Sequence, residues 1–157
     1  MSDKQQDKTK EAQQFQGTLD EHRECMQYVV ALEACLDRRP DDAGLWIGGL
    51  LEHLPGLART MREHFEAEEE GALFTDLPKR NPMVHARLKV LKEEHPRLLH
   101  DVERIMEITA GLRDAELYEL REINARIQLF IARLRRHEAT ENELIFEAYW
   151  DDYGTGD

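Results

Sequence analysis

The stretch HFEAEEE, residues 64–70, decides how the rest of the chain is interpreted. On an α-helix, residues four apart lie on the same face, so His64 and Glu68 direct an imidazole nitrogen and a carboxylate to one point. That geometry is typical of metal ligands, but a His and a Glu four apart also occur on ordinary solvated helix faces. The pair alone is therefore weak evidence for a metal site.

The same pair occurs a second time, in HEATENE, residues 137–143. His137 and Glu141 repeat the first pair at an offset of 73 residues, and a solitary histidine precedes each pair by 42 residues. Chance spacing of four out of only seven histidines would rarely produce this pattern. Two equivalent halves thus predict one set of six metal ligands: His22, His64, Glu68, His95, His137 and Glu141.

Composition restricts the class of protein. The 157 residues suit one domain with a sizeable core, and 34% charged residues with only five prolines and nine glycines favour amphipathic helices over sheets. Asp and Glu number 33 against 21 Lys and Arg, which gives a formal charge of -12. This balance argues against a nucleic-acid partner or an anionic membrane and favours cations.

The amino terminus is polar and contains no apolar run, so we expect neither a signal peptide nor a membrane anchor, and a cytoplasmic protein. Cys25 and Cys35 are ten residues apart on one predicted helix, a distance of roughly 15 Å. They are too far apart to form a disulfide with each other, and we expect both to be reduced.

Apolar residues at spacings of three and four predict four helices, over about 15–36, 42–71, 82–110 and 114–148. Residues 1–14 are interpreted as a flexible polar leader, 15–150 as the bundle and 151–157 as a polar tail. Pro55 predicts a kink or break in the second helix. Asn81 and Pro82 are a typical helix start, Gly111 a helix stop, and Asp114 a cap for the last helix.

Short connections between four such helices predict an all-α fold, an antiparallel up-down-up-down four-helix bundle with a pseudo-twofold internal repeat. The six candidate ligands fall on the inward stripes, where unpaired polar groups are costly and need a binding partner. Two cations meet this need if each takes two histidines and the two carboxylates bridge them, with an oxide or hydroxide from solvent as a third bridge. Nitrogen and oxygen ligands with open positions suit two iron ions best, then manganese, with zinc as a further alternative.

The combined pattern resembles the hemerythrin-like family of HHE cation-binding domains. The motifs are a lone His on the first helix, HFxxEE on the second, EEH on the third and HxxxE on the fourth, and the resemblance covers residues from about 15 to 149. It implies a non-haem di-iron centre in a four-helix bundle. The four histidines would be terminal ligands, and Glu68 and Glu141 would bridge the irons.

Two positions depart from the oxygen-carrying members of that family. Those proteins have a second His four residues after the third-helix His, where this chain has Leu99, and an Asp five residues after the fourth-helix His, where it has Asn142. The chain is more similar to the four-His, two-Glu branch, which includes di-iron proteins linked to iron–sulfur repair and nitric oxide stress. Some repair proteins have a Cys-containing amino-terminal region, whereas the first cysteine in this sequence is Cys25.

Other acidic and histidine residues are interpreted as structural or solvated. Glu69 and Glu70 are expected to be solvated charges, His53 a core or end-of-bundle residue, and His100 exposed. A ferritin-like site needs Glu three residues before a His, and none of the seven histidines has one.

Two function classes remain. The favoured one is a redox-active di-iron protein that binds or reduces O2, nitric oxide or peroxide as a sensor, scavenger or iron donor, with an unknown electron donor and no firm assignment as an enzyme. The alternative is a cation-binding or iron-storing bundle without turnover, and a metal-free interaction module is a third class. No membrane partner is expected, and the chain is predicted to be a monomer or weak homo-oligomer.

Overall fold

The structure is a computed structural model, and it describes residues 2–38, 42–112 and 116–153, with side chains described as far as residue 148. These residues form helices and no strand, which confirms the predicted all-α class. The four long helices are α1 (Asp3–Asp37), α2 (Ala43–Glu70), α5 (Pro82–Ala110) and α6 (Leu117–Tyr153). Two single-turn helices, α3 (Ala72–Thr75) and α4 (Leu77–Arg80), connect α2 to α5.

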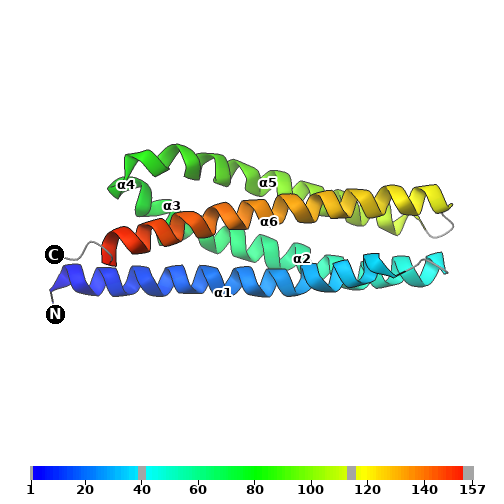
Figure 1. The fold of residues 1–157 in the computed structure, drawn as a ribbon, viewed down its shortest axis with the longest axis horizontal. Coiled ribbons are helices and arrows are strands. Elements are labelled where there is room, and N and C mark those ends of the chain that lie inside the picture. The colour runs from blue at the N-terminus through cyan, green and yellow to red at the C-terminus, as the bar shows by residue number, and fades with distance from the viewer. Residues whose placement is uncertain (1, 39–41, 113–115, 154–157) are drawn as a thin grey trace.

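The long helices form an antiparallel bundle, as predicted (Figure 1). The helices α1 and α5 run in one direction, and α2 and α6 return in the other. Each long helix packs against the next in the chain, and α6 closes the ring by packing against α1. The two halves of the chain therefore each supply one helical hairpin to a shared interior.

Local sequence explains where the helices begin and end. The Asp42 side chain accepts a hydrogen bond from the Leu45 N–H at 3.2 Å and caps α2. The predicted start of α5 is confirmed, because the Asn81 side chain accepts from the Met83 N–H at 3.0 Å and Pro82 opens the helix. The helix ends before Gly111, also as predicted. The proposed cap Asp114 lies outside the described residues.

The prediction of a loose leader over residues 1–14 is wrong for residues 3–14, because α1 begins at Asp3. This segment consists largely of Lys, Gln, Glu and Ala, which favour helix, so its polarity reflects exposure and not lack of structure. It also has partners in the α3–α4 connection. Gln14 accepts a hydrogen bond from the Ala72 N–H at 2.8 Å, and Glu11 pairs with Arg80.

The boundary predicted for the tail, residue 151, also differs, because α6 continues to Tyr153. The remaining tail residues, 154–157, lie outside the described part of the chain.

Two apolar clusters fill the bundle, one toward each end. The larger contains Val29, Leu54 and Ile127, and the smaller contains Phe15, Leu88 and Leu144. On α1, α5 and α6 the candidate metal ligands occur between residues of one cluster and residues of the other, and on α2 they occur where the larger cluster ends, shortly before Ala72 of α3 in the smaller cluster. The predicted site is therefore a polar layer between two apolar cores.

The second helix continues through Pro55, so the predicted break is absent. The next residue, Gly56, lies against the Tyr28 ring: a Cβ at this position would lie 2.5 Å from the Tyr28 Cε1 atom. At Gly48, on the same helix, a Cβ would have no neighbour within 4 Å.

This contrast yields a prediction about stability. Gly56→Ala forces the Tyr28 ring to move and should destabilise the protein by about 1–3 kcal/mol. Gly48→Ala should stabilise it by roughly 0.5–1 kcal/mol, because alanine has the higher helix propensity. Urea denaturation of both variants tests this, and equal effects from the two substitutions would contradict the close packing of Tyr28 on Gly56.

Candidate metal centre

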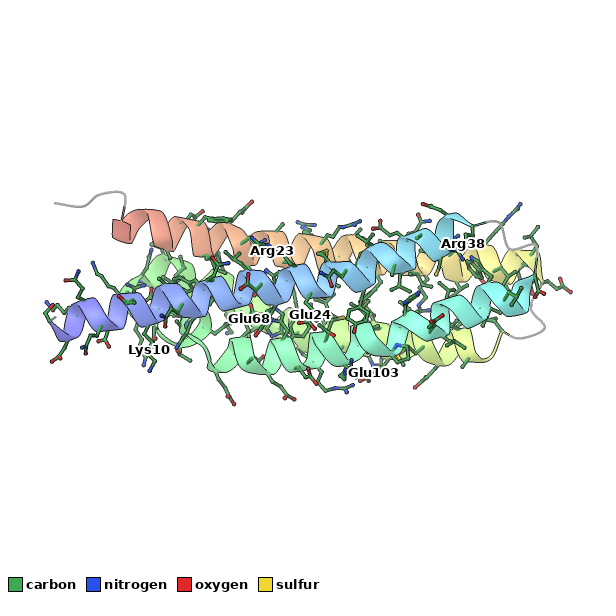
Figure 2. All side chains as sticks on the ribbon, turned by 90° about the horizontal axis from the view of Figure 1, so that it is seen from below. Lys10, Arg23, Glu24, Arg38, Glu68 and Glu103 are labelled. Carbon is green, nitrogen blue, oxygen red and sulfur yellow. The ribbon has the colours of Figure 1, made fainter. Side chains whose placement is uncertain are left out.

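All six predicted ligand residues are buried, each with at most 4% of its surface exposed. Each of the four long helices supplies at least one of them: α1 and α5 each supply one His, and α2 and α6 each supply a His and a Glu four residues apart. In Figure 2, Glu68 lies between α1 and α2, and Arg38 lies at the end of α1. The structure thus brings together residues that are up to 119 positions apart in the chain.

The ligand atoms form two groups, and within each group they lie within 4.8 Å of one another. One group contains His22, His64, Glu68 and Glu141, and the other contains His95, His137 and Glu141. Glu141 belongs to both groups, which is the position of a carboxylate shared between two cations. Glu68 belongs only to the first group, although the sequence pattern treats it as the equivalent of Glu141.

The inner faces of these side chains have unused ligand atoms. Among the described residues, the Nε2 atoms of the four histidines and both carboxylate oxygens of Glu68 and Glu141 have no hydrogen-bond partner. The His64 Nε2 and the Glu68 Oε2 nonetheless lie only 2.9 Å apart. Two neighbouring ligands bound about 2.1 Å from one cation at a right angle would be about 3 Å apart. The donor set and its spacing therefore fit a bound metal.

The opposite ring nitrogens all have acceptors. The His137 Nδ1 lies 2.6 Å from a carboxylate oxygen of Glu94, and the His64 Nδ1 pairs with Glu21. An ionised carboxylate only accepts, so Nδ1 carries the proton and Nε2 presents its lone pair inward. Such outer carboxylates fix the tautomer and orientation of metal-binding histidines.

The other two histidines are held in the same way, by the residues that directly follow Glu68 and Glu141 in the chain. The His95 Nδ1 lies 3.1 Å from Glu69 Oε1, and the His22 Nδ1 lies 2.7 Å from Asn142 Oδ1. The expectation that Glu69 is only a solvated charge is wrong, because this carboxylate is the acceptor for His95.

The sequence contained a signal for all four outer partners. Glu94 follows Glu21 by 73 residues, and Asn142 follows Glu69 by 73 residues, the same offset that relates the ligands. Sequence reasoning missed them because it followed only the solitary histidines and the His–Glu pairs four residues apart, and these residues belong to neither pattern. The outer partners are thus part of the internal repeat, and Asn142 is the one position where an amide replaces a carboxylate.

Aromatic packing further orients the rings. Phe65 stacks on His95 with ring centroids 4.0 Å apart and an interplanar angle of 6°. His22 and His64 meet edge to face at 4.7 Å, and His95 and His137 meet at 4.9 Å. His22 therefore lies next to His64, and His95 lies next to His137.

Burial dominates the electrostatics of the metal-free site. It lowers the pKa of His22 to about 4, helped by the charge of His64, and lowers the pKa of His95 to about 3, helped by His137. Burial also opposes protonation of His64, but the nearby carboxylates of Glu68 and Glu21, which form ion pairs with its two ring nitrogens, outweigh it and raise the pKa of His64 to about 9. Burial raises the pKa of Glu68 as well. Without a cation, His64 and Glu68 therefore retain a proton between them.

One further buried carboxyl lies beside the centre. Glu138 follows His137 on α6, is 4% exposed and contacts Cys25, and one of its oxygens has no partner among the described residues. Burial raises the pKa of Glu138 to about 7 and also raises the pKa of the Cys25 thiol. Sequence reasoning missed Glu138, because the equivalent residue in the first half is Phe65 and the repeat gives no signal there.

The remaining histidines do not join the centre. His85 and His100 are exposed, as expected for His100, and His53 is half-buried. None of the three belongs to a group of ligand atoms found among the described residues. Both cysteines are free, Cys25 buried and Cys35 half-buried.

Four long helices around a buried layer of imidazoles and carboxylates define a metal-binding helical bundle. The family described as "Hemerythrin HHE cation binding domain" matches residues 17–149, and the chain therefore belongs to that family. No curated protein and no solved structure matches the chain at a significant level. Within the described residues, no helix combines the length and apolar character needed to cross a membrane.

The lowered pKa of His95 predicts a pH dependence of the metal-free protein. A histidine that titrates near 6.5 when unfolded but near 3 when folded contributes stability that is complete above pH 6.5 and is lost as the pH falls. Below pH 6.5, the free energy of unfolding of the chelator-treated wild type should fall, relative to that of His95→Gln, by up to about 1.4 kcal/mol per pH unit. Urea denaturation between pH 7 and 5 measures this difference. His100 is exposed on the same helix, and the unfolding free energy of His100→Gln should change with pH as that of the wild type does. The same pH dependence in His95→Gln and the wild type would contradict a buried neutral imidazole at His95.

The outer partners predict an effect on cation affinity. Glu94→Ala removes the acceptor of the His137 Nδ1–H and should weaken Zn²⁺ binding by about 10–100-fold. Glu93→Ala, at the exposed neighbouring position, should leave the affinity unchanged. Competition against a chelator of known affinity measures both variants. Unchanged binding in Glu94→Ala would show that this carboxylate does not support the centre.

Proposed function

We propose that the centre holds two iron ions and binds or reduces O2, nitric oxide or peroxide, so that the protein acts as a sensor, scavenger or iron donor. The observation that carries this proposal is the set of inward Nε2 atoms and carboxylate oxygens without partners, enclosed between two apolar clusters. A buried layer of this kind is costly unless cations occupy it.

In this proposal each iron takes one pair of histidines. His22 and His64 serve one iron, and His95 and His137 serve the other, in agreement with the two groups of ligand atoms. Glu141 bridges the irons, and Glu68 is assigned as the second bridge by its place in the repeat. A nitrogen and oxygen donor set without thiolates favours iron, with manganese or zinc as alternatives.

Iron held by imidazole and carboxylate groups supplies redox chemistry and open coordination positions for a small ligand. The protein's own groups supply orientation and protons. The outer acceptors hold each Nε2 toward the interior, and the two apolar clusters exclude bulk water on both sides of the layer. Glu138, buried next to His137 and in contact with Cys25, is assigned as the group that holds a proton beside the centre.

A storage or structural role is the second candidate. It is favoured by the position of the polar layer, since cations bound between two apolar clusters would stabilise the whole bundle even without turnover. This role requires bound metal but no reaction with small ligands, so the two functions differ in a measurable way.

The test is metal content together with the visible spectrum of protein purified from iron-supplemented cells, before and after dithionite. We expect about two irons per chain, near-ultraviolet bands that bleach on reduction, and a reaction of the reduced protein with O2 or nitric oxide within seconds. Glu141→Gln should lose iron and the bands together, whereas Glu143→Gln, exposed on the same helix, should keep both.

The outcomes separate the candidates. Two irons that do not react with O2, nitric oxide or peroxide would favour storage. Zinc alone, or full iron content in Glu141→Gln, would contradict the proposed di-iron site.

A further inference from the structure

A groove between α5 and α6 leads from the surface to the outer side of the metal centre. It encloses about 620 Å³, within the range of small-molecule sites, and its inner end is formed by Glu94 and His137. Leu91 and Leu98, both nearly buried, form an apolar wall. Four arginines line the same groove, in a protein whose formal charge is -12: Arg87, Arg97, Arg133 and Arg136.

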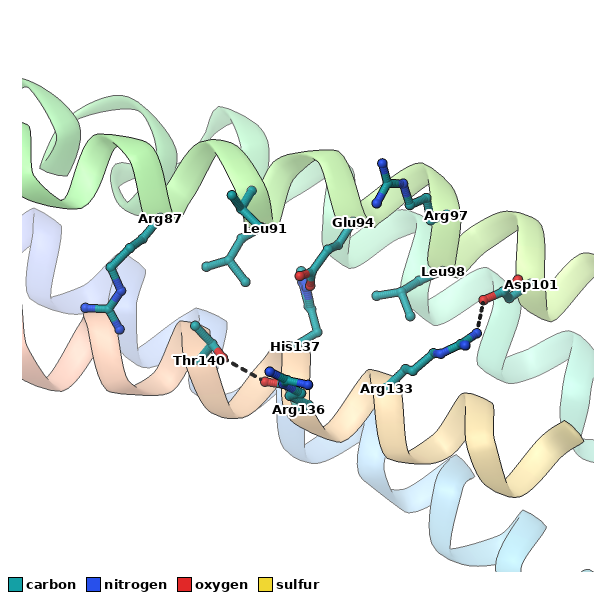
Figure 3. Close-up of a pocket in the computed structure, with 11 residues that line it drawn as sticks. Arg87, Leu91, Glu94, Arg97, Leu98, Asp101, Arg133, Arg136, His137 and Thr140 are labelled. Atoms are coloured by element: carbon teal, nitrogen blue, oxygen red, sulfur yellow. Dashed lines mark hydrogen bonds and ion pairs between the residues drawn. The ribbon is translucent and has the colours of Figure 1, made fainter. Parts of the chain in front are cut away.

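Two of these arginines have their charge neutralised by neighbours. Arg133 lies 3.6 Å from Asp101, and Arg87 lies 3.3 Å from Glu147. Arg97 and Arg136 form no ion pair with an acidic side chain in the described part of the chain. Figure 3 shows the four arginines placed around the Glu94–His137 pair, on both walls of the groove.

The internal repeat provides a comparison for this groove. Its counterpart at the 73-residue offset lies between α1 and α2, where a smaller cavity of about 310 Å³ surrounds Glu21. At the positions equivalent to Arg97 and Arg136, the first half has Glu24 and Glu63, both exposed. In both grooves a glutamate, Glu94 or Glu21, is the acceptor for a histidine Nδ1, so supporting the histidine does not require arginine. Of these two grooves, as far as the described residues show, only the one between α5 and α6 is lined by arginine.

We propose that the α5–α6 groove binds a small organic anion, with its acidic group held by Arg97 and Arg136 and its apolar body against Leu91 and Leu98. Guanidinium groups bind carboxylates and phosphates through paired, charge-assisted hydrogen bonds. The surrounding acidic surface repels anions elsewhere, so the groove is the favoured place for them. This site does not depend on which metal the centre holds, although Glu94, the acceptor for the His137 Nδ1–H, lines its inner end.

The test uses two fluorescent probes with the same apolar body. Anilinonaphthalene sulfonate is an anion, and N-phenyl-1-naphthylamine lacks the sulfonate. In the purified full chain, Arg97→Gln with Arg136→Gln should weaken binding of the anionic probe by about tenfold or more and leave the neutral probe unaffected. The control, Arg59→Gln with Arg121→Gln, removes the same charge from exposed positions outside the groove and should bind both probes like the wild type.

Competition identifies the acidic group of the ligand. Phenyl phosphate and benzoate share an aromatic body, and displacement of the anionic probe by either supports the proposal and ranks phosphate against carboxylate. Failure of both to displace the probe, or equal loss of anionic-probe binding in the two double variants, would overturn it. All four arginines are exposed, and unchanged thermal unfolding verifies that the variants are folded. The metal content of each variant is measured in parallel, so that loss of anion binding in the groove is distinguished from loss of the metal centre.

Discussion

The structure depends on the cost of placing imidazoles and carboxylates in an apolar interior. His22, His64, His95 and His137 direct their Nε2 atoms into a layer that no described side chain satisfies, and Glu68 and Glu141 add carboxylates to it. Removing such groups from water without a partner costs several kcal/mol each. Bound cations offset this cost, and they also explain why the layer can lie between two apolar clusters without disrupting the bundle.

The internal repeat distributes this layer over two hairpins. The same 73-residue offset relates the inner ligands and the outer residues that orient them. The repeat is not complete, and its exceptions are informative. Asn142 replaces a carboxylate as the acceptor for His22, and Glu138 replaces the aromatic ring of Phe65. Arg97 and Arg136 of the α5–α6 groove occupy the positions at which the first half has Glu24 and Glu63. These exceptions make the two sides of the centre chemically different, although the two helical hairpins are related by the internal repeat.

Most of the fold and the inner part of the centre could be predicted from the sequence, because both depend on periodic spacing. The stripe of α6, from Leu120 through His137 to Leu144, is buried as the spacing predicts. The leader was missed because a polar, exposed segment gives no periodic signal, although its propensity for helix is high. Glu69 was misjudged for another reason: its partner His95 is 26 residues away, and only the packing of α2 on α5 brings them together. The environment of Glu138 likewise depends on tertiary contacts.

The central claim is that two cations share the buried layer. The most direct measurement is anomalous diffraction from crystals of protein purified with its metal, recorded on both sides of the iron edge. Two peaks per chain, about 3–4 Å apart between the four histidine Nε2 atoms and flanked by Glu141, are the predicted result. A layer that contains ordered water and no metal, or metal found only at the protein surface, would contradict it.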